Sequence, residues 1–573
     1  MRKPALRLVW IVSSLLFLLS RPAQAQVHKT SDFLLSDSIA NVNVDLFETP
    51  FGEVHELGVV DLRVRLTNLS GEPRQVELTF GLGLGGSGLR IRRMVSLQPA
   101  ESQLVTETLA NSNIGDARFV MLEVRVPGAG EITLGPLRGA RSPHRGRSPQ
   151  PFRLFTTPRS EKLIDHVSAW RIEAALTTPS SFPTFWGGYR NVDAVVAKRD
   201  DLHELTPEAQ SALRNWIASG GHLILADGGA DPSSVELSAL FPDEAEGRAL
   251  DRRFLTANGW GSTSYVAGRI DLCPAAILTT GQYSSLVPGS YELPELTDLA
   301  IPGVAETPSF GLLPAALSLI ALVSVVLVHF LLWRRGRQIY ILVTYPGIAL
   351  LLTFAFVAAI LLKEGLAIHG HARTLIYYDQ TLGQAFLWEE VHLFGTMRPR
   401  GGLRLPATAE VFIDARTSQM GRFFERGSEL VLSSGVFQPR VRSAFRASFP
   451  LSLRERLVIE KDDDGGYRAL NGFADDIRWL GVRIDGRSFE AKNIAAGEAG
   501  ELDSVDDVHP VGPVHEISAL APISSKVNES SEGTYRAYFE SSGLVNWGTD
   551  EIASDRIGEC VVQGRFELPE SGR

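Results

Sequence analysis

Two histidines that flank a single glycine are the strongest candidates for a metal site in this sequence. His369 and His371 stand two positions apart, and on a β-strand such residues share one face, so both imidazoles can reach one metal ion. Asp379 can complete the site only if the chain folds back. The alternative is that both histidines are polar residues beside a membrane surface, and we expect no bound cofactor.

Other patterns for catalysis or ligand binding are incomplete. The segment Gly83 to Gly88 has the glycine spacing of a dinucleotide-binding loop, but an alternating strand follows it where a helix is required. The acidic triplet Asp462 to Asp464 lacks the spacing of a calcium loop. No serine-nucleophile motif and no phosphate-binding loop stands out. The sequence therefore favours a protein that is not an enzyme.

The chain has two cysteines, Cys273 and Cys560. Both fall in segments that we expect outside the cytoplasm, where an oxidising environment permits a disulfide between them. Two unrelated free thiols are the alternative.

The first 25 residues have the pattern of a secretory signal peptide. Three cations occur within the first seven positions, an apolar run extends from Leu8 to Leu19, and Ala23 and Ala25 frame a cleavage site. An uncleaved membrane anchor is the alternative. Either reading indicates export from a bacterial cytoplasm.

Two long apolar segments in mid-chain are typical of transmembrane helices. Residues 311–333 and 339–362 contain no charged side chain, and a helix of this length, at about 1.5 Å per residue, can cross the hydrocarbon core of a bilayer. The loop 334–338 is rich in cations, which marks the cytoplasmic side. These cations are Arg334, Arg335 and Arg337. We expect a two-pass protein of the bacterial cytoplasmic (inner) membrane, with its N- and C-terminal domains on the periplasmic side.

Strand-like alternation dominates residues 30–135. Leu62, Val64 and Leu66 alternate with polar residues, and a turn rich in Gly, Ser and Pro separates them from a second alternating run. Strands with one wet face and short turns predict a β-sandwich of the immunoglobulin-like kind. Residues 136–154, rich in Arg and Pro, are predicted to be a linker.

Residues 155–300 have an α/β pattern. A short apolar strand near 192–197 is followed by a helix that starts after Thr206, with Pro207 in its first position. Two glycines end the helix before the next strand begins at His222. Such a strand–helix–strand unit implies a parallel sheet.

This stretch resembles the class I glutamine-amidotransferase-like fold, in the non-catalytic form found in an uncharacterised family of bacterial two-span membrane proteins. The resemblance rests on residues 193–197, 205–210, 213–225 and 268–272. True amidotransferases place a nucleophilic cysteine on the turn after such a strand. Here that turn, 227–231, reads Asp-Gly-Gly-Ala-Asp. The resemblance therefore implies the fold without the activity.

Residues 365–573 return to β character, with a hairpin predicted at Asp485-Gly486. The predicted fold class is multidomain: a β-sandwich, an α/β parallel-sheet domain, two transmembrane helices and a β-rich domain. The net charge of −10 argues against nucleic acid as a partner, because phosphate binding needs a basic surface.

These patterns favour a membrane-anchored, non-catalytic extracytoplasmic binding or assembly protein of the bacterial envelope. Its expected partners are the lipid bilayer and another membrane or envelope protein, while any small-molecule ligand stays undefined. One alternative is an accessory subunit of a membrane transport or secretion complex. The other is an outer-face hydrolase with an atypical site around His369, His371 or Ser233.

Overall fold

The computed structural model of the 573-residue chain describes most of its strands and helices. The described residues are 26–29, 33–47, 59–82, 89–110, 119–138, 152–161, 172–226 (without 191), 255–273 (without 258–259), 313–364 (without 337), 368–395, 401–413, 422–462 (without 435, 438 and 440), 465–505, 533–540 and 557–566, with single residues near 237–250 and at 517. The predicted signal peptide, residues 1–25, lies outside this part of the chain. The described ends of the predicted linker, residues 136–138 and 152–154, lie in strands.

Two sheets formed by the N-terminal region pack into a β-sandwich around an apolar core, which includes Val64, Leu66 and Leu78. The first sheet has the order β2-β3-β4-β7 and the second β19-β22-β21-β6-β5-β8-β9. Three strands of the second sheet come from far down the chain, and β21 lies parallel to β6. The strands are β2 (Phe33–Ile39), β3 (Val42–Phe47), β4 (Val59–Asn68), β5 (Arg74–Leu82), β6 (Leu89–Leu97), β7 (Ser102–Ala110), β8 (Phe119–Val126), β9 (Gly130–Arg138), β19 (Leu403–Pro406), β21 (Arg422–Arg426) and β22 (Glu429–Ser434).

The C-terminal region forms an eleven-stranded sheet in the order β20-β23-β18-β17-β30-β29-β26-β27-β28-β25-β24. At one end this sheet curls into a second sandwich, and its core is continuous with that of the first. The strands are β17 (Ile368–Asp379), β18 (Gln384–Gly395), β20 (Glu410–Ile413), β23 (Ser443–Ser452), β24 (Leu457–Lys461), β25 (Tyr467–Asn471), β26 (Ile477–Ile484), β27 (Arg487–Ile494), β28 (Ala499–Val505), β29 (Thr534–Phe539) and β30 (Ile557–Arg565).

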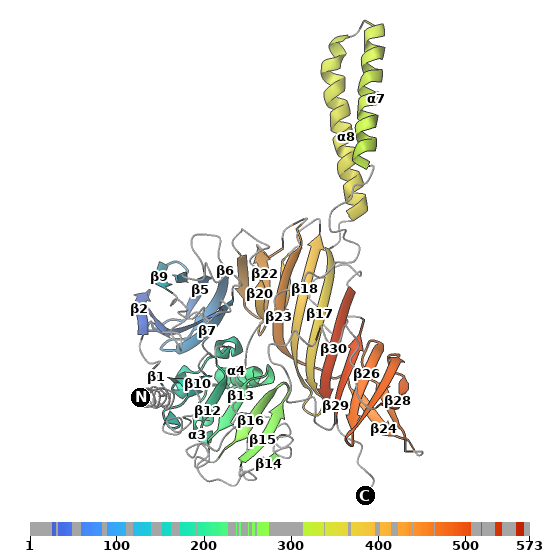
Figure 1. The fold of residues 1–573 in the computed structure, drawn as a ribbon. Coiled ribbons are helices and arrows are strands. Elements are labelled where there is room, and N and C mark those ends of the chain that lie inside the picture. The colour runs from blue at the N-terminus through green and yellow to red at the C-terminus, as the bar shows by residue number, and fades with distance from the viewer. Residues whose placement is uncertain are drawn as a thin grey trace, which may run out of the picture.

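The two sandwiches have the same topology. In the first, the antiparallel pairs are β3–β4, β4–β7, β5–β6, β5–β8 and β8–β9. In the second, strands in the same chain order form the same pairs: β24–β25, β25–β28, β26–β27, β26–β29 and β29–β30. Figure 1 shows the copies at opposite ends of the β-rich body, one in blue and the other in orange and red. The chain therefore contains a seven-stranded sandwich twice.

A buried asparagine marks the same position in both copies. Asn68 ends β4 and Asn471 ends β25, and both are fully buried. The Nδ2 group of each donates to the carbonyl four residues further on, at 2.9 Å in both copies. It also donates to the end of a later strand, at Leu97 (3.3 Å) or Ile494 (3.1 Å). Each Oδ1 accepts from the backbone N–H two residues on, at 3.0 Å. These shared bonds fix the correspondence between the copies residue by residue.

Between the sandwiches lies an eight-stranded sheet in the order β1-β11-β10-β12-β13-β16-β15-β14. Along this order, every neighbouring pair from β1 to β16 is parallel. The last two pairs, β16–β15 and β15–β14, are antiparallel. The elements are β1 (Gln26–Lys29), β10 (Phe152–Thr156), β11 (Ile172–Leu176), η1 (Pro179–Ser181), η2 (Trp186–Tyr189), β12 (Ala194–Ala197), α3 (Arg199–His203), α4 (Pro207–Ala218), β13 (His222–Leu225), β14 (Leu255–Ala257), β15 (Trp260–Tyr265) and β16 (Gly268–Leu272).

Helix α4 forms where the sequence predicts it. The Thr206 hydroxyl accepts from the backbone N–H of Ala209 at 3.2 Å and caps the first turn. Leu213 and Trp216 are fully buried on the face that packs on the sheet. A side chain at Gly268 would come within 1.8 Å of the Ile217 carbonyl oxygen, so the close contact between α4 and β16 requires glycine. The predicted strand–helix–strand unit β12–α4–β13 is confirmed.

The helices α7 (Leu313–Arg334) and α8 (Ile341–Glu364) form an antiparallel hairpin that projects from the β-rich body (Figure 1). The short η5 (Gln338–Tyr340) leads into α8. We call this hairpin the arm. Three residues separate the end of α8 from β17, so the arm joins the eleven-stranded sheet almost directly.

The predicted fold class, a series of independent domains along the chain, is wrong. Strands dominate the described residues, and β19, β21 and β22 share a sheet with β6 although they are more than 300 positions away. The expected α/β parallel-sheet domain is a mixed sheet that takes β1 from the chain before the first sandwich and is flanked, in the described part, by only α3 and α4. Local alternation could not reveal these distant pairings.

The prediction of a two-pass location in the bacterial inner membrane is also wrong. Within the described residues, Ile341–Ala358 is the one helical segment long and apolar enough to cross a membrane. The described apolar part of α7, Leu319–Arg334, is too short to count as a membrane-crossing helix. Two transmembrane helices, with both flanking regions outside, are therefore not supported.

Candidate functional site

A short aromatic segment, residues 179–190, touches three parts of the molecule at once. The carbonyl of Ser181 accepts from Arg63 Nη1 of β4 at 2.9 Å. The indole of Trp186 donates to the carbonyl of Thr408, beside β20, at 2.7 Å. Tyr189 stacks on Trp216 of α4 with ring centres 5.3 Å apart. This segment, which we call the junction, holds the first sandwich, the eight-stranded sheet and the eleven-stranded sheet together.

Arg190 ends the junction with a buried charge. Its Nε forms an ion pair with Glu410 of β20, and its Nη2 donates to Ser448 Oγ of β23 at 3.0 Å. The guanidinium also lies 4.4 Å from the ring centre of Phe412. Burial raises the pKa of the Glu410 carboxyl, while the adjacent Arg190 opposes that rise. The two opposite charges therefore neutralise each other inside the protein.

A second buried ion pair lies on the other side of the junction. Glu107 of β7 is fully buried, 3.2 Å from Arg426 Nε of β21 and 4.0 Å from Arg93 Nη1 of β6. Arg426 also covers the ring of Phe185 at 4.5 Å. Burial lowers the pKa of Arg93, and the charge of Glu107 opposes that change. These contacts tie the N-terminal region to strands more than 300 positions later.

A small cavity lies beside Arg190. It has a volume of ≈ 10 Å³ and is lined by Arg190, Trp388, Glu389, Phe412, Arg446, Ala447 and Ser448. A space of this size holds about one water molecule, and the surface that faces it is mostly apolar. It has no room for an organic substrate, so its charges serve to join strands.

A row of alternating charges crosses four neighbouring strands near the arm. Arg446, Glu390, Arg373 and Glu559 are cross-strand neighbours on β23, β18, β17 and β30. Arg446 Nη2 and Glu390 Oε2 are 3.0 Å apart, as are Arg373 Nε and Glu559 Oε2. Opposite charges in directly opposed positions stabilise a sheet, which accounts for the row without a ligand.

The predicted metal residues lie next to this row. His371 of β17 is paired in register with His392 of β18, and His392 Nε2 is 3.0 Å from Glu390 Oε1. His369 shares the face of His371, but Asp379 ends the strand eight residues away, about 26 Å at about 3.3 Å per residue. Within the described residues, no group of three His, Cys, Asp or Glu side chains could hold a metal ion. The structure thus adds His392 but does not bring Asp379 to the pair.

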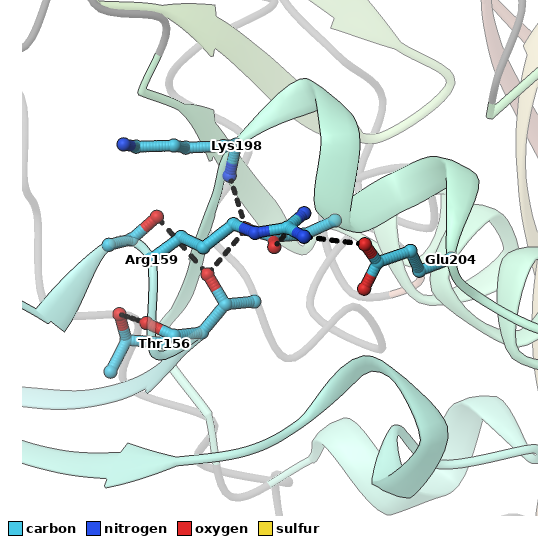
Figure 2. A network of polar contacts seen from close by, with 7 residues as sticks. Thr156, Arg159, Lys198 and Glu204 are labelled. Carbon is cyan, nitrogen blue, oxygen red and sulfur yellow. Dashed lines mark hydrogen bonds and ion pairs between the residues drawn. The ribbon is translucent and has the colours of Figure 1, made fainter.

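A separate polar cluster lies at the carboxyl ends of β10 and β12 (Figure 2). The buried Asp201 of α3 accepts from Thr157 Oγ1 (2.5 Å) and from the backbone N–H of Lys198 (3.0 Å). Arg159 bridges Asp201 (3.3 Å) and Glu204 (2.6 Å). The chain leaves β10 toward β11 and leaves β12 toward β13, so this is the switch point at which parallel sheets often bind ligands. Here both Asp201 oxygens are bonded within the cluster, which caps α3 and fixes the turn after β10.

Sequence reasoning missed a histidine–aspartate pair on β13 and β16. His222 Nε2 is 2.8 Å from Asp271 Oδ2, and Arg269 Nε donates to the other carboxylate oxygen at 2.7 Å. A buried carboxylate orients an imidazole for proton transfer, but the nearby Ser262 hydroxyl accepts from Arg269 at 2.9 Å and is held there. The pair spans 49 positions, and only the alternation that puts Arg269 and Asp271 on one strand face hinted at it.

The arm exposes more apolar surface than any other described element. None of Ile341–Ala358 is buried, and large side chains such as Leu342, Leu350 and Phe354 are 74% to 79% exposed. The predicted topology residues Arg334 and Arg335 are exposed at its tip. Arg337 lies outside the described residues.

The remaining predicted site residues do not form a common site in the described part of the chain. Cys273 and Cys560 are both buried and are not joined to each other, so the predicted disulfide is absent. Ser233 and the turn 227–231 lie outside the described residues.

Comparisons with known proteins identify no family. No protein-family model matches the chain, and no curated protein matches its sequence. Among solved structures, a yeast delta-COP-I mu-homology domain aligns over 35% of this chain and 96% of its own, at 9% identity and a TM-score of 0.17. A cycloisomaltooligosaccharide glucanotransferase of Paenibacillus sp. aligns over 37% and 44%, at 12% identity and a TM-score of 0.15. Similarity at this level supports no argument about fold or function.

Proposed function

We propose that this chain is a membrane-anchored, non-catalytic binding or assembly protein of the bacterial envelope, which enters lipid through α8 of the arm. The observation on which the proposal rests is the arm itself. It is apolar and unburied over the whole of Ile341–Ala358, and it projects from a body whose own apolar side chains are packed in two cores.

The distribution of apolar residues on the arm favours lipid over a protein groove. Consecutive exposed side chains at Leu350 and Leu351 point to different sides of α8, and the same holds for Leu322 and Val323 of α7. A helix that docks on one protein partner is apolar along one stripe, whereas a helix apolar all round needs an apolar environment all round. A bilayer supplies that environment.

Four polar side chains of the arm form hydrogen bonds within it, as a lipid environment requires. His329 Nδ1 of α7 is 2.9 Å from Tyr345 Oη of α8. The hydroxyls of Thr344 and Thr353 donate to the backbone carbonyls four residues earlier, at 2.9 Å and 2.8 Å. Side chains that must avoid lipid contact adopt such internal bonds.

The body supports a role in binding and assembly. In its described part the buried carboxylates Glu107, Glu390 and Glu410 each face an arginine, and the cavity beside Arg190 is of water size. Groups used for acid–base chemistry need access to a substrate. These charges instead join neighbouring strands and segments of the body.

Vesicle flotation tests the anchoring. The full chain is mixed with phosphatidylcholine–phosphatidylglycerol vesicles and centrifuged through a density gradient, and the floating fraction is measured. In Leu350→Glu/Phe354→Glu, each buried carboxylate costs about 2.5 kcal/mol or more in lipid, so the vesicle-bound fraction should fall more than tenfold. Leu69→Glu is the matched control, since Leu69 is 61% exposed on the body. Equal flotation of both variants, or a wild-type chain that does not float, rejects the proposal.

A further inference from the structure

One outward sheet face of the first sandwich already acts as a docking face. On the layer formed by β3, β4 and β7, Arg63 donates to the carbonyl of Ser181 at 2.9 Å and lies 5.2 Å from the ring centre of Phe155. Thr106 Oγ1 on the same face accepts from the backbone N–H of Thr184 at 3.1 Å. This layer therefore holds the junction against the first sandwich.

The duplicated fold identifies the equivalent face of the second sandwich. Alignment at the two buried asparagines matches β3, β4 and β7 with β24, β25 and β28. The cross-strand row Asp45–Arg65–Leu104 of the first copy then matches the row Glu460–Arg468–Glu501 of the second. Both rows place an acid beside an arginine.

Within the described part of the chain, nothing covers the second face. In the first copy the carbonyl of Leu104 accepts from Thr184 Oγ1 of the junction at 3.3 Å. Its counterpart, Glu501, has a side chain that is 83% exposed, and the neighbouring Arg468 is 50% exposed. The counterpart of Thr106 is Asp503, which is also exposed.

The uncovered face has an apolar row bordered by carboxylates. Val458, Leu470 and Ala499 are cross-strand neighbours, and Val458 is 40% exposed. Of the described residues on these strands, four acids share this face with one cation, Arg468, which lies 3.0 Å from Asp462 and 3.9 Å from Glu501. The acids are Glu460, Asp462, Glu501 and Asp503.

We propose that the outward face of β24, β25 and β28 is the docking surface for a protein partner that presents lysine or arginine side chains beside a small apolar contact. The inference extends the proposed assembly role by naming the surface and the chemistry of its partner. Charge complementarity favours a basic protein as the partner, because an acidic surface repels nucleic acid and anionic lipid. It also repels the same face of a second copy.

Site-specific photocrosslinking tests the surface. Benzoylphenylalanine replaces Val458 in the full-length, membrane-bound chain, and replaces Met94 in a matched control, since Met94 is 49% exposed on the first sandwich. After irradiation of intact cells we expect one discrete crosslinked product from position 458 that position 94 does not give. Mass spectrometry identifies the crosslinked protein, whose purified form is then titrated against the chain.

Charge reversal separates specific docking from adventitious capture. Glu501→Lys/Asp503→Lys should reduce both the crosslink yield and the affinity of the purified partner at least tenfold, and 0.5 M salt should weaken binding by screening. Glu501→Gln/Asp503→Asn should have a smaller effect. Both positions are exposed, so thermal unfolding of each variant should match the wild type.

Each other outcome overturns the inference. These are a product that charge reversal leaves unchanged, a product of two copies of this chain, or no product above the level of position 94. Vesicle flotation of the same samples distinguishes this failure from failure of the anchoring proposal, because the charge-reversed chain should still float.

Discussion

Arg190 and Glu410 form a buried ion pair across 220 positions of sequence. Arg190 is the last residue of the junction, and Glu410 opens β20 at the edge of the eleven-stranded sheet. Their contact locks two parts of the fold that could otherwise separate, because neither charge is stable in the protein interior without the other.

Removal of one member of this pair should destabilise the protein strongly. Glu410→Ala leaves the Arg190 charge buried without its carboxylate, which costs about 3–5 kcal/mol. Urea unfolding followed by tryptophan fluorescence measures the change. The exposed pair Arg404–Glu429 provides the control, since Glu429→Ala should change stability by about 1 kcal/mol or less. Similar costs at the two pairs would refute the structural role of the buried one.

The pH dependence of stability should reveal the burial of Glu410. Its pKa is raised in the folded protein, so the folded state binds the proton more tightly than the unfolded state, where the pKa is about 4.3. The stability from this group is therefore complete below about pH 4 and is lost as the pH rises through the raised folded value. The free energy of unfolding of wild type minus that of Glu410→Gln should fall over this window. A flat difference would contradict the assignment.

The duplication predicts equal sensitivity at two distant asparagines. Asn68→Ala and Asn471→Ala each remove a buried amide and leave several backbone groups without a partner, at a cost of about 2–4 kcal/mol. Thermal unfolding of the two variants should therefore shift by similar amounts. Asn43→Ala, at a half-buried position on a strand face, should stay within about 0.5 kcal/mol of wild type. A large effect at one asparagine alone would argue against equivalent roles.

The hydrogen bond between His329 and Tyr345 should couple the two helices of the arm. A double-mutant cycle with His329→Phe and Tyr345→Phe, measured by unfolding in detergent micelles, should give an interaction of about 0.6 kcal/mol, the usual value in a membrane environment. Phenylalanine keeps the ring volume, so packing changes little. Additive single effects would mean that the bond makes no net contribution.

Local features of this fold were readable from sequence because they depend on neighbouring residues. The cap at Thr206, the buried face of Leu213 and Trp216, and the turn at Asp485-Gly486 all follow from short-range spacing, and all appear in the structure. The alternation of Leu62, Val64 and Leu66 likewise predicted their inward orientation.

Long-range features left no such signal. The parallel pairing of β21 with β6, the ion pairs of Arg190 and Glu107, and the contact between His222 and Asp271 depend on which distant strands meet. The duplication was equally hidden, since the two copies share hydrogen-bond geometry around Asn68 and Asn471 while most surrounding side chains differ. A β-sandwich tolerates such divergence because its core needs only apolar residues of suitable volume.

The attachment of α8 to β17 has a mechanical consequence. β17 is paired over twelve residues with β18 and over nine with β30, and three residues separate it from the end of α8. A pull on the arm along the strand axis would load both ladders in shear, so that their hydrogen bonds must break together and not one after another. The body is therefore fastened to its arm by the most force-resistant geometry that a sheet offers, and tension on the arm would be distributed through the whole eleven-stranded sheet.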